Sequence, residues 1–342
     1  MTDQVSTKKP GDVREGGSLP QAGGGVALLR GLVRQKELSI VIATIAVAIY
    51  FSVSSTGFNN ADNYHTIAQF FAPWAIVAAG EVMLLICGEI DLSAGFVFTL
   101  SPFVLMSFYN GGTPLFLALI LALVVCALIG TVNGFIRTRF NIPSFIVTLG
   151  MYFLIEGISL LMSNGAPVSA PTSGWVVSVF GHSRWSELIW VLIIVVVMQT
   201  ILSATRFGIY TQAVGGNAIG AAESGIRSNL IKIVNFSISS TLAGFGGILD
   251  GMRTGSFDPT NGGPTTMFLA VAAAVIGGTA LLGGSGTVVG ALFGAILLGI
   301  VFDGFNLQGV SANSFDVVLG IAILVAMLLN VYLSYLRRRV SR

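Results

Sequence analysis

Residues 206–232, with the sequence RFGIYTQAVGGNAIGAAESGIRSNLIK, form the longest polar interruption with a basic bias in the apolar part of this chain. Asn217 is a good helix N-cap, because its side chain can accept a hydrogen bond from a free N–H group of the first turn. Residues 218–224 are mostly small, and Gly225 can adopt the left-handed conformation that ends a helix. The stretch therefore predicts a short helix, which is too short to persist alone in water.

The body of this predicted helix consists of Ile219, Gly220, Ala221 and Ala222. Small side chains let two backbones approach closely, so the helix suits packing against another protein. We therefore interpret residues 206–232 as a cytoplasmic docking loop that the apolar segments around it present. A surface linker between two membrane helices would have a similar composition.

The composition identifies the class of protein. Of the 342 residues, 54% are hydrophobic and only 9% are charged, against roughly 25% charged residues in a soluble domain. Apolar runs of membrane-spanning length recur along the chain, and a bilayer core about 30 Å thick needs about 20 residues of helix. We therefore predict an all-α polytopic membrane protein. Cys87 and Cys126 both lie in apolar runs and indicate neither a disulfide framework nor a metal site.

The apolar segments divide the chain into regions. We predict that residues 1–37 form a cytoplasmic N-terminus, which is polar and disordered up to residue 25. After residue 25, apolar residues recur at helical spacing with basic residues between them, as in a helix lying on a membrane surface or in the positive flank of a first span. Residues 38–336 predict a transmembrane domain, and residues 337–342 a cytoplasmic tail. The predicted spans are 38–56, 66–87, 93–109, 114–136, 144–163, 187–204, 233–252, 267–282, 287–303 and 315–336.

The basic residues support this topology, because Lys and Arg accumulate near the cytoplasmic ends of membrane helices. With the N-terminus inside, all 17 Lys and Arg residues except Arg184 and Arg253 fall in cytoplasmic segments. The sequence therefore predicts ten spans with both termini inside. The glycines between 267 and 303 also allow a half-spanning hairpin there. The outer loop 163–186 is long enough to fold over the mouth of the protein.

Polar residues within the spans or in the turn after the second span are candidates for a substrate pathway, because buried ionisable groups are costly in a membrane. Structural hydrogen bonding would explain the same residues, and Asp250 and Arg253, three residues apart on one helical face, are expected to pair with each other. The pathway candidates are Glu81, Asp91, Ser93, Asn133, Thr148 and Glu156.

Several functions are disfavoured by what the sequence lacks. Its only histidines, His65 and His182, lie in predicted outer loops, and no predicted span has a cation at its centre, so a charge-relay carrier is disfavoured. No G-x-x-x-x-G-K-[ST] motif occurs, so we expect no P-loop ATP site, no catalytic residues and no bound metal or cofactor. The glycine-rich stretches 244–248 and 277–290 indicate close helix crossings rather than phosphate binding.

Four stretches in order resemble a known family. They are GEIDLSAG at 88–95, TVNGFIRTRFNIPSFIVTLG at 131–150, AVGGN at 213–217 with SGI at 224–226, and VIGGTALLGGSGTVVGALFGA at 275–295. Together they resemble the permease subunits of bacterial ATP-driven (ABC) sugar importers, the family of the ribose, xylose, arabinose and galactose permeases. The resemblance covers nearly all of residues 40–336.

The resemblance implies a role for each part of the chain. The loop 206–232 would contain a coupling helix that docks on a separate cytoplasmic ATP-binding subunit, and that subunit, not this chain, would bind and hydrolyse ATP. Relatives often have an acidic and a basic residue where this chain has Ala218 and Ala222, so Glu223 is the only charge within the short helix. The implied coupling residues are Gly215, Gly216, Asn217, Ile219, Gly220, Ala221, Ala222, Glu223, Ser224, Gly225 and Ile226.

The same resemblance implies the partners and location. A second permease copy, identical or paralogous, would complete the pathway in the bacterial inner membrane, in contact with membrane lipid and without nucleic acid. A periplasmic or lipid-anchored binding protein would deliver a monosaccharide or related polyol. Two alternatives stay open: a permease for branched-chain amino acids or nucleosides in the same superfamily, and a secondary carrier that works alone.

Overall fold

The computed structural model describes residues 36–310 together with residues 314, 317, 318, 320, 321, 324 and 328. The predicted N-terminal region up to residue 35, most of the predicted span 315–336 and the tail 337–342 lie outside the described residues.

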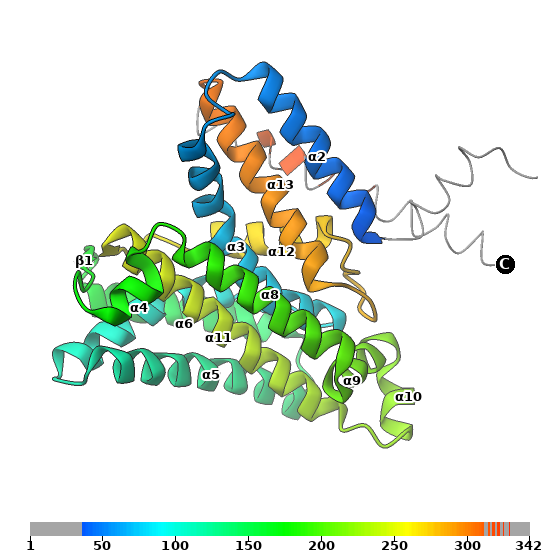
Figure 1. Cartoon of the computed structure of the whole chain (residues 1–342). Coiled ribbons are helices and arrows are strands. Elements are labelled where there is room, and N and C mark those ends of the chain that lie inside the picture. The colour runs from blue at the N-terminus through cyan, green and yellow to red at the C-terminus, as the bar shows by residue number, and fades with distance from the viewer. Residues whose placement is uncertain are drawn as a thin grey trace, which may run out of the picture.

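Helices make up most of the described chain (Figure 1). The long helices are α2 (Lys36–Ser54), α3 (Ala61–Ile86), α4 (Ala94–Asn110), α5 (Leu115–Phe140), α6 (Ser144–Ser163), α8 (Ser186–Ala204), α11 (Ser228–Thr254), α12 (Gly263–Ile276) and α13 (Val288–Leu307). The short elements are β1 (Val168–Ser169), α7 (Trp175–Val177), the π-helix η1 (Ser178–His182), α9 (Arg206–Gly216), α10 (Ala218–Glu223) and β2 (Ser256–Phe257).

The prediction of an all-α polytopic membrane protein is confirmed in its class. Every predicted apolar segment within residues 36–310 coincides with a long helix, and six of these helices, α3, α5, α6, α8, α11 and α13, have the length and apolar composition of a membrane span. The total of ten spans and the cytoplasmic termini stay predictions. The predicted span 267–282 is shorter in the structure, because α12 ends at Ile276 after 14 residues, about 21 Å of helix.

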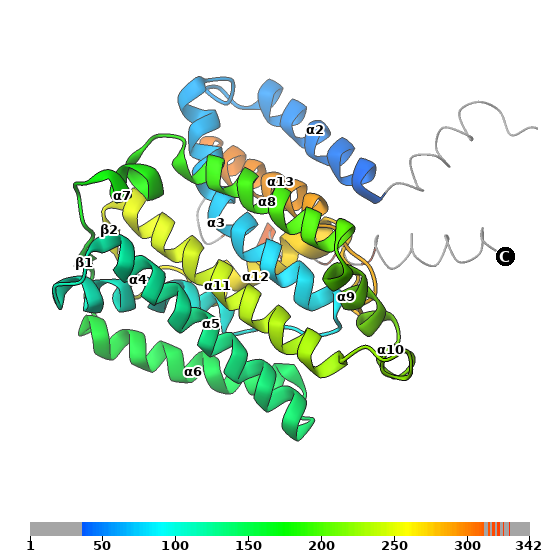
Figure 2. The ribbon, with the colours of Figure 1, turned by 60° about the horizontal axis from the view of Figure 1, so that its bottom comes forward.

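α3 lies at the centre of the bundle and contacts α8, α11, α12 and α13. In its most apolar window 83% of the residues are buried, whereas α5 and α6 are only 28% and 17% buried in theirs. Figures 1 and 2 show the reason: α3 and α11 run through the middle, with α5 and α6 on one side and α2 and α13 on the other. The apolar outer faces of α5 and α6 are therefore free to contact lipid or another protein.

The interpretation of the glycine stretch 244–248 as a close helix crossing is confirmed. A Cβ atom at Gly247 would lie 1.9 Å from the carbonyl oxygen of Phe98, so α11 and α4 touch backbone to backbone. Any larger side chain at this position would push the two helices apart.

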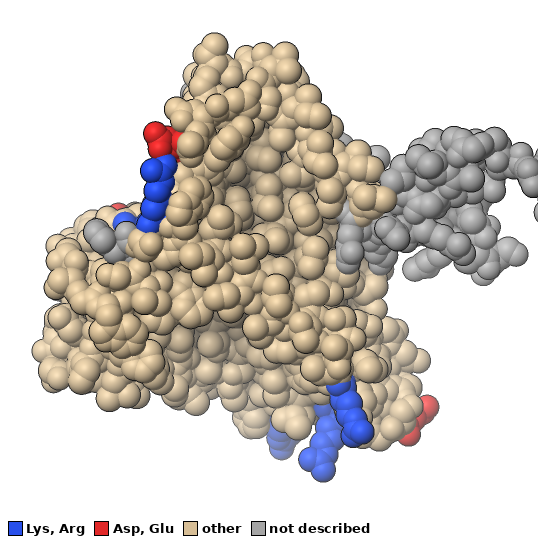
Figure 3. All heavy atoms as spheres, viewed as in Figure 1, with Lys and Arg blue, Asp and Glu red and all other residues tan. Residues whose placement is uncertain are grey.

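The two ends of the bundle differ in charge. The end that carries α9 and α10, which we call the α10 end, gathers the basic side chains seen at the lower right of Figure 3. The opposite end, which we call the β1 end, carries the loop after α6, where β1 pairs antiparallel with β2. There Arg184 pairs with Asp62, and Arg253 pairs with Asp250 and Glu187. This segregation agrees with the charge pattern used above to predict the orientation.

Candidate functional site

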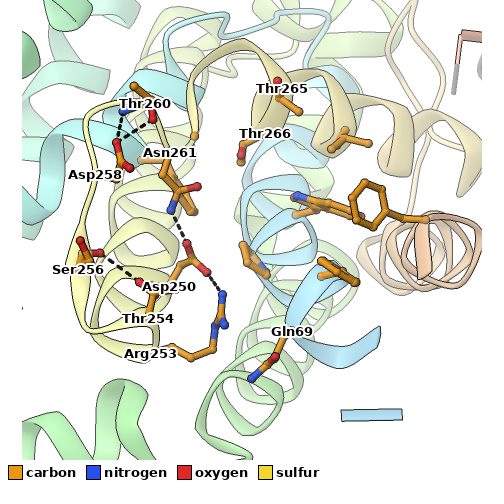
Figure 4. Close-up of a pocket in the computed structure, with 17 residues that line it drawn as sticks. Gln69, Asp250, Arg253, Thr254, Ser256, Asp258, Thr260, Asn261, Thr265 and Thr266 are labelled. Atoms are coloured by element: carbon orange, nitrogen blue, oxygen red, sulfur yellow. Dashed lines mark hydrogen bonds and ion pairs between the residues drawn. The ribbon is translucent and has the colours of Figure 1, made fainter. Parts of the chain in front are cut away.

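A cavity of about 720 Å³ lies at the β1 end, between α3, α4, α11, α12, α13 and the segment that joins α11 to α12 (Figure 4). Figure 4 shows Asp250, Arg253 and Asn261 on one side of it and Gln69 on α3 on the other. The residues that line it are Gln69, Phe70, Pro73, Trp74, Phe98, Asp250, Arg253, Thr254, Ser256, Asp258, Thr260, Asn261, Gly262, Thr265, Thr266, Leu269 and Phe302.

The charged wall of the cavity starts with the last turns of α11. Asp250 and Arg253 are three residues apart, and the predicted pair forms, with Arg253 Nη2 at 2.5 Å from Asp250 Oδ1. Arg253 Nε also lies 3.0 Å from Oε2 of Glu187, in the first turn of α8. Asn261 Nδ2 donates to Asp250 Oδ2 at 2.6 Å. The Arg253 guanidinium thus pairs with the carboxyl groups of Asp250 and Glu187, and Asp250 also accepts a hydrogen bond from the Asn261 amide at the cavity wall.

The segment after β2 is held in place by local bonds. Asp258 Oδ1 accepts from the backbone N–H and the hydroxyl of Thr260, at 2.8 and 2.7 Å. The hydroxyl of Thr99, on α4, donates to the backbone carbonyl of Asn261 at 2.7 Å. These bonds position the Asn261 amide before any ligand arrives.

Aromatic rings line the same cavity from α3 and α13. Phe70 and Phe302 pack edge to face with ring centroids 4.6 Å apart, and Trp74 packs edge to face on Phe302 at 6.1 Å. Pro73 lies inside α3 and has no N–H, so it removes the helical hydrogen bond that residue 73 would donate to the carbonyl of Gln69. The cavity therefore combines apolar rings with hydroxyl, amide and carboxylate groups, which is the composition of a small-molecule site.

Most of the predicted pathway residues lie elsewhere, in a buried polar cluster around residues 87–93. Asp91 Oδ1 accepts from the Ser93 N–H at 2.9 Å and from its hydroxyl at 2.5 Å, and Ser240 on α11 donates to Oδ2 at 3.2 Å. Asn133 Nδ2, from α5, donates to Ser93 Oγ at 2.9 Å. This cluster joins the turn after α3 to α5 and α11.

Glu81 and Thr148 complete the cluster. Ser239 donates to Glu81 Oε1 at 2.9 Å, and the Thr148 hydroxyl accepts the backbone N–H of Leu92 at 3.1 Å. Five of the six predicted pathway residues are fully buried, and none of the five lines the cavity: Glu81, Asp91, Ser93, Asn133 and Thr148. The sixth, Glu156, is half-buried on α6. Their roles as substrate contacts stay predictions. Their hydrogen bonds show that they also join helices to one another.

Glu89, in the same turn, has two cationic partners. Arg137 Nε lies 2.9 Å from both carboxylate oxygens, and Lys232 Nζ lies 2.5 Å from Oε1. Burial alone would raise the pKa of Glu89, but the hydrogen bonds from Arg137 and Lys232 outweigh burial and hold the pKa below its usual value. Glu89 is therefore ionised at neutral pH and binds the ends of α5 and α11 to the turn after α3.

The short helix predicted in the docking loop is confirmed as α10, together with its caps. Asn217 Oδ1 accepts from the N–H of Gly220 at 3.0 Å. At the other end, Gly225 has φ +84°, and the N–H groups of Gly225 and Ile226 donate to the carbonyls of Ala222 and Ala221, both at 3.0 Å. This pair of bonds is a Schellman motif, which requires a left-handed residue where Gly225 stands.

Among the small residues of α10, Ala221 is buried, whereas Ala218 and Ala222 are exposed. Ala221 is only 6% exposed and packs with Cys87, Val214 and Ile231 of this same chain, whereas Ile219 is 74% exposed. Ala221 therefore packs against α9 and α11 of its own chain. The coupling role of residues 215–226 stays a prediction.

Membrane-length helices packed around a cavity with paired charges and aromatic rings are the architecture of a membrane transport protein. The family model described as "Branched-chain amino acid transport system / permease component" matches residues 63–327, and the chain belongs to this permease family.

Curated relatives cover nearly the whole chain. The xylose/arabinose import permease protein XylH of Sulfolobus acidocaldarius is 36% identical over 88% of this chain and 86% of its own length. The ribose import permease protein RbsC of Escherichia coli is 35% identical over 87% of this chain and 94% of its own length. The probable ABC transporter permease protein YphD of Escherichia coli is 33% identical over 95% of this chain and 98% of its own length. No solved structure gives a significant match.

Two residues beside the cavity have no role that the sequence predicts. Glu187 lies at the start of a predicted apolar span and contacts Arg253, and Asn261 lies between two predicted spans and donates to Asp250. The available signal was the polar run TGSFDPTNGGPTT at 254–266, which is unusually rich in hydroxyl and amide groups for a connection between membrane helices.

Proposed function

We propose that this chain is the permease subunit of an ATP-driven importer for a monosaccharide or related polyol. The relatives that support this proposal are import permeases for xylose and arabinose and for ribose. The chain would form the translocation pathway and would couple to a separate ATP-binding subunit, with no ATPase site of its own.

One observation in the structure supports the proposed substrate class. Arg253 is the only cationic side chain among the described residues that line the cavity, and it already binds both Asp250 and Glu187. The remaining polar groups are hydroxyls, amides and carboxylate oxygens beside aromatic rings, which suit a neutral ligand that has both hydroxyl groups and apolar C–H faces. A sugar or polyol has this chemistry.

The same observation weighs against an amino acid as the substrate, although the family description names branched-chain amino acids. An amino-acid carboxylate is best held by a cation that has no other anionic partner, and Arg253 is already paired with Asp250 and Glu187. A neutral polyol needs no such exchange.

The assembly follows from the same proposal. The ATP-binding subunit would dock at the α10 end, which makes that end cytoplasmic, and a binding protein would deliver substrate to the cavity at the β1 end. A second permease copy would pack in the bilayer of the inner membrane, and the full chain would cross it ten times with both termini inside. The segregation of basic side chains to the α10 end supports this orientation (Figure 3).

Reconstitution into liposomes tests the proposal. The chain, the ATP-binding subunit and the binding protein encoded with it are incorporated together, and uptake of labelled ribose, xylose, arabinose and leucine is measured with ATP or a non-hydrolysable analogue inside. We expect uptake of one or more sugars only with ATP. Uptake of leucine alone would show that the substrate class is wrong. Uptake driven by a sodium or proton gradient without ATP would instead show a secondary carrier.

A further inference from the structure

The α10 end has a second exposed apolar element besides α10. It is the turn formed by residues 280–285, which we call the leucine turn, in the segment between α12 and α13. Leu282, at its tip, is 92% exposed, the highest value of any large apolar side chain in the described part of the chain. Leu281 beside it is 40% exposed.

The exposure of Leu282 belongs to an ordered turn. The N–H of Gly283 donates to the carbonyl of Ala280 at 3.1 Å, and the N–H of Ala280 donates to the carbonyl of Ser285 at 2.9 Å. Gly283 and Gly284 both have positive φ angles, +86° and +81°, which other residues adopt with strain. Two internal hydrogen bonds and two left-handed residues thus hold the leucines outward.

The leucine turn rests directly on α9, immediately before α10 begins. A Cβ atom at Gly283 would lie 2.8 Å from the carbonyl oxygen of Gly215, and one at Gly284 would lie 3.1 Å from the Cα atom of Gly216. The N–H of Gly284 also donates to the carbonyl of Ile86, the last residue of α3, at 2.8 Å. The turn, the end of α3 and the α9–α10 junction therefore form one backbone-packed unit.

Ile219 and Leu282 are the two most exposed large apolar side chains of this unit. Ile219 leaves it from α10 and Leu282 from the leucine turn, whereas the neighbouring Ala221 and Val214 are buried. Unlike the exposed apolar residues of α5 and α6, neither lies on a membrane-length helix. Exposed apolar side chains that gather on one surface are typical of a contact with another protein.

We propose that the leucine turn is a second docking element for the ATP-binding subunit, and that Leu282 and Ile219 together anchor that subunit. This inference rests on the proposed function, which places the ATP-binding subunit at α10. The turn extends that surface because its backbone is packed on the two residues that precede Asn217, so a subunit that covers Ile219 meets Leu282 on the same unit. Movement of the docked subunit would then reach the end of α3 through the Gly284–Ile86 bond.

Binding measurements on the permease in nanodiscs test the proposal. The purified ATP-binding subunit is titrated onto the wild-type chain, Leu282→Ser, Leu282→Met and Leu161→Ser. Leu161, in the last turn of α6 at the β1 end, is 81% exposed and gives a matched control. Loss of one buried leucine should weaken binding about tenfold or more, while Leu282→Met and Leu161→Ser should bind as the wild type does.

The outcomes separate this inference from the proposed function. If the wild-type chain does not bind the ATP-binding subunit at all, the proposed function fails. If the wild type binds and Leu282→Ser binds equally well, only the leucine turn is refuted as a docking element.

A second measurement distinguishes the partner from lipid. A nitroxide probe is attached to Leu282→Cys, since Cys87 and Cys126 are both buried and free. We expect the probe to be accessible to a water-soluble relaxation agent and to become protected when the ATP-binding subunit is added. Access only to oxygen dissolved in the bilayer would place Leu282 in lipid and overturn the proposal.

Discussion

The two clusters of buried charge in this permease have opposite stoichiometry. At the β1 end two carboxylates, Asp250 and Glu187, share the single cation Arg253. Toward the α10 end two cations, Arg137 and Lys232, share the single carboxylate Glu89. The side chains of these three acidic residues are no more than 7% exposed, so loss of a partner would leave a buried polar group unpaired.

This difference suits two different tasks. An excess of carboxylate at the β1 end leaves acceptor oxygens beside the cavity, and Asp250 uses one of them to hold Asn261. Near the α10 end the cations are in excess, so both carboxylate oxygens of Glu89 are occupied. Glu89 thereby joins the turn after α3 to α5 and α11. The first cluster can exchange hydrogen bonds with a ligand, whereas the second is built as a structural joint.

Removal of Arg253 should have the largest effect, because it leaves two buried carboxylates without a cation. We expect Arg253→Gln to cost about 3–5 kcal/mol and to lower the melting temperature measured by size-exclusion chromatography after heating. The triple variant Arg253→Gln, Asp250→Asn, Glu187→Gln should recover most of the loss, since no charge is left unpaired. Equal melting of Arg253→Gln and the wild type would contradict the shared-cation description.

Removal of Glu89 should cost less, because the cations that it leaves behind are closer to solvent. Arg137 and Lys232 side chains are 19% and 13% exposed, and long cationic side chains can extend toward water. We expect Glu89→Gln to cost about 1.5–3 kcal/mol, the usual range for hydrogen bonds to a charged group. Thr138→Ser, in the same turn of α5, serves as the control and should melt near the wild type. A loss as large as that of Arg253→Gln would remove the contrast between the two clusters.

Acidification should reduce the difference between the wild type and Glu89→Gln. The pKa of Glu89 is lowered in the folded protein, so its contribution is complete above the usual carboxyl pKa of about 4.3 and is lost as the pH falls through the lower folded value. Melting temperatures measured between pH 7 and pH 3 should therefore converge only at the acidic end. A difference that grew with acidification would show that the sign of this coupling is wrong.

Removal of Asp250 should have the smallest effect on stability, because Arg253 keeps Glu187 as its partner. We expect Asp250→Asn to cost less than about 1 kcal/mol and yet to raise the KM for uptake several-fold, since the hydrogen bond to Asn261 weakens and the cavity loses an acceptor. Uptake kinetics and melting on the same preparation check both halves of this prediction. An unchanged KM would show that the cavity is not part of the transport pathway.

Local sequence determined the features that depend on residues close together in the chain. The caps of α10 form as predicted because Asn217 and Gly225 act on backbone groups no more than four residues away. The Asp250–Arg253 pair follows from helical spacing alone, and the apolar segments follow from the length that a bilayer demands. The family, too, was recognisable from short ordered motifs.

Tertiary structure alone decided which of these residues meet. Glu187 reaches Arg253 across 66 positions of sequence, and Ser240 reaches Asp91 across 149, because α8 and α11 are packed beside distant parts of the chain. Polar residues spaced along separate spans looked equivalent in the sequence, yet five of the predicted six join the buried cluster around residues 87–93 while the cavity forms from others. No linear sequence pattern encodes those contacts, because they depend on how the helices pack. Small residues such as Gly247 permit that close packing, although their side chains take no part in the polar contacts.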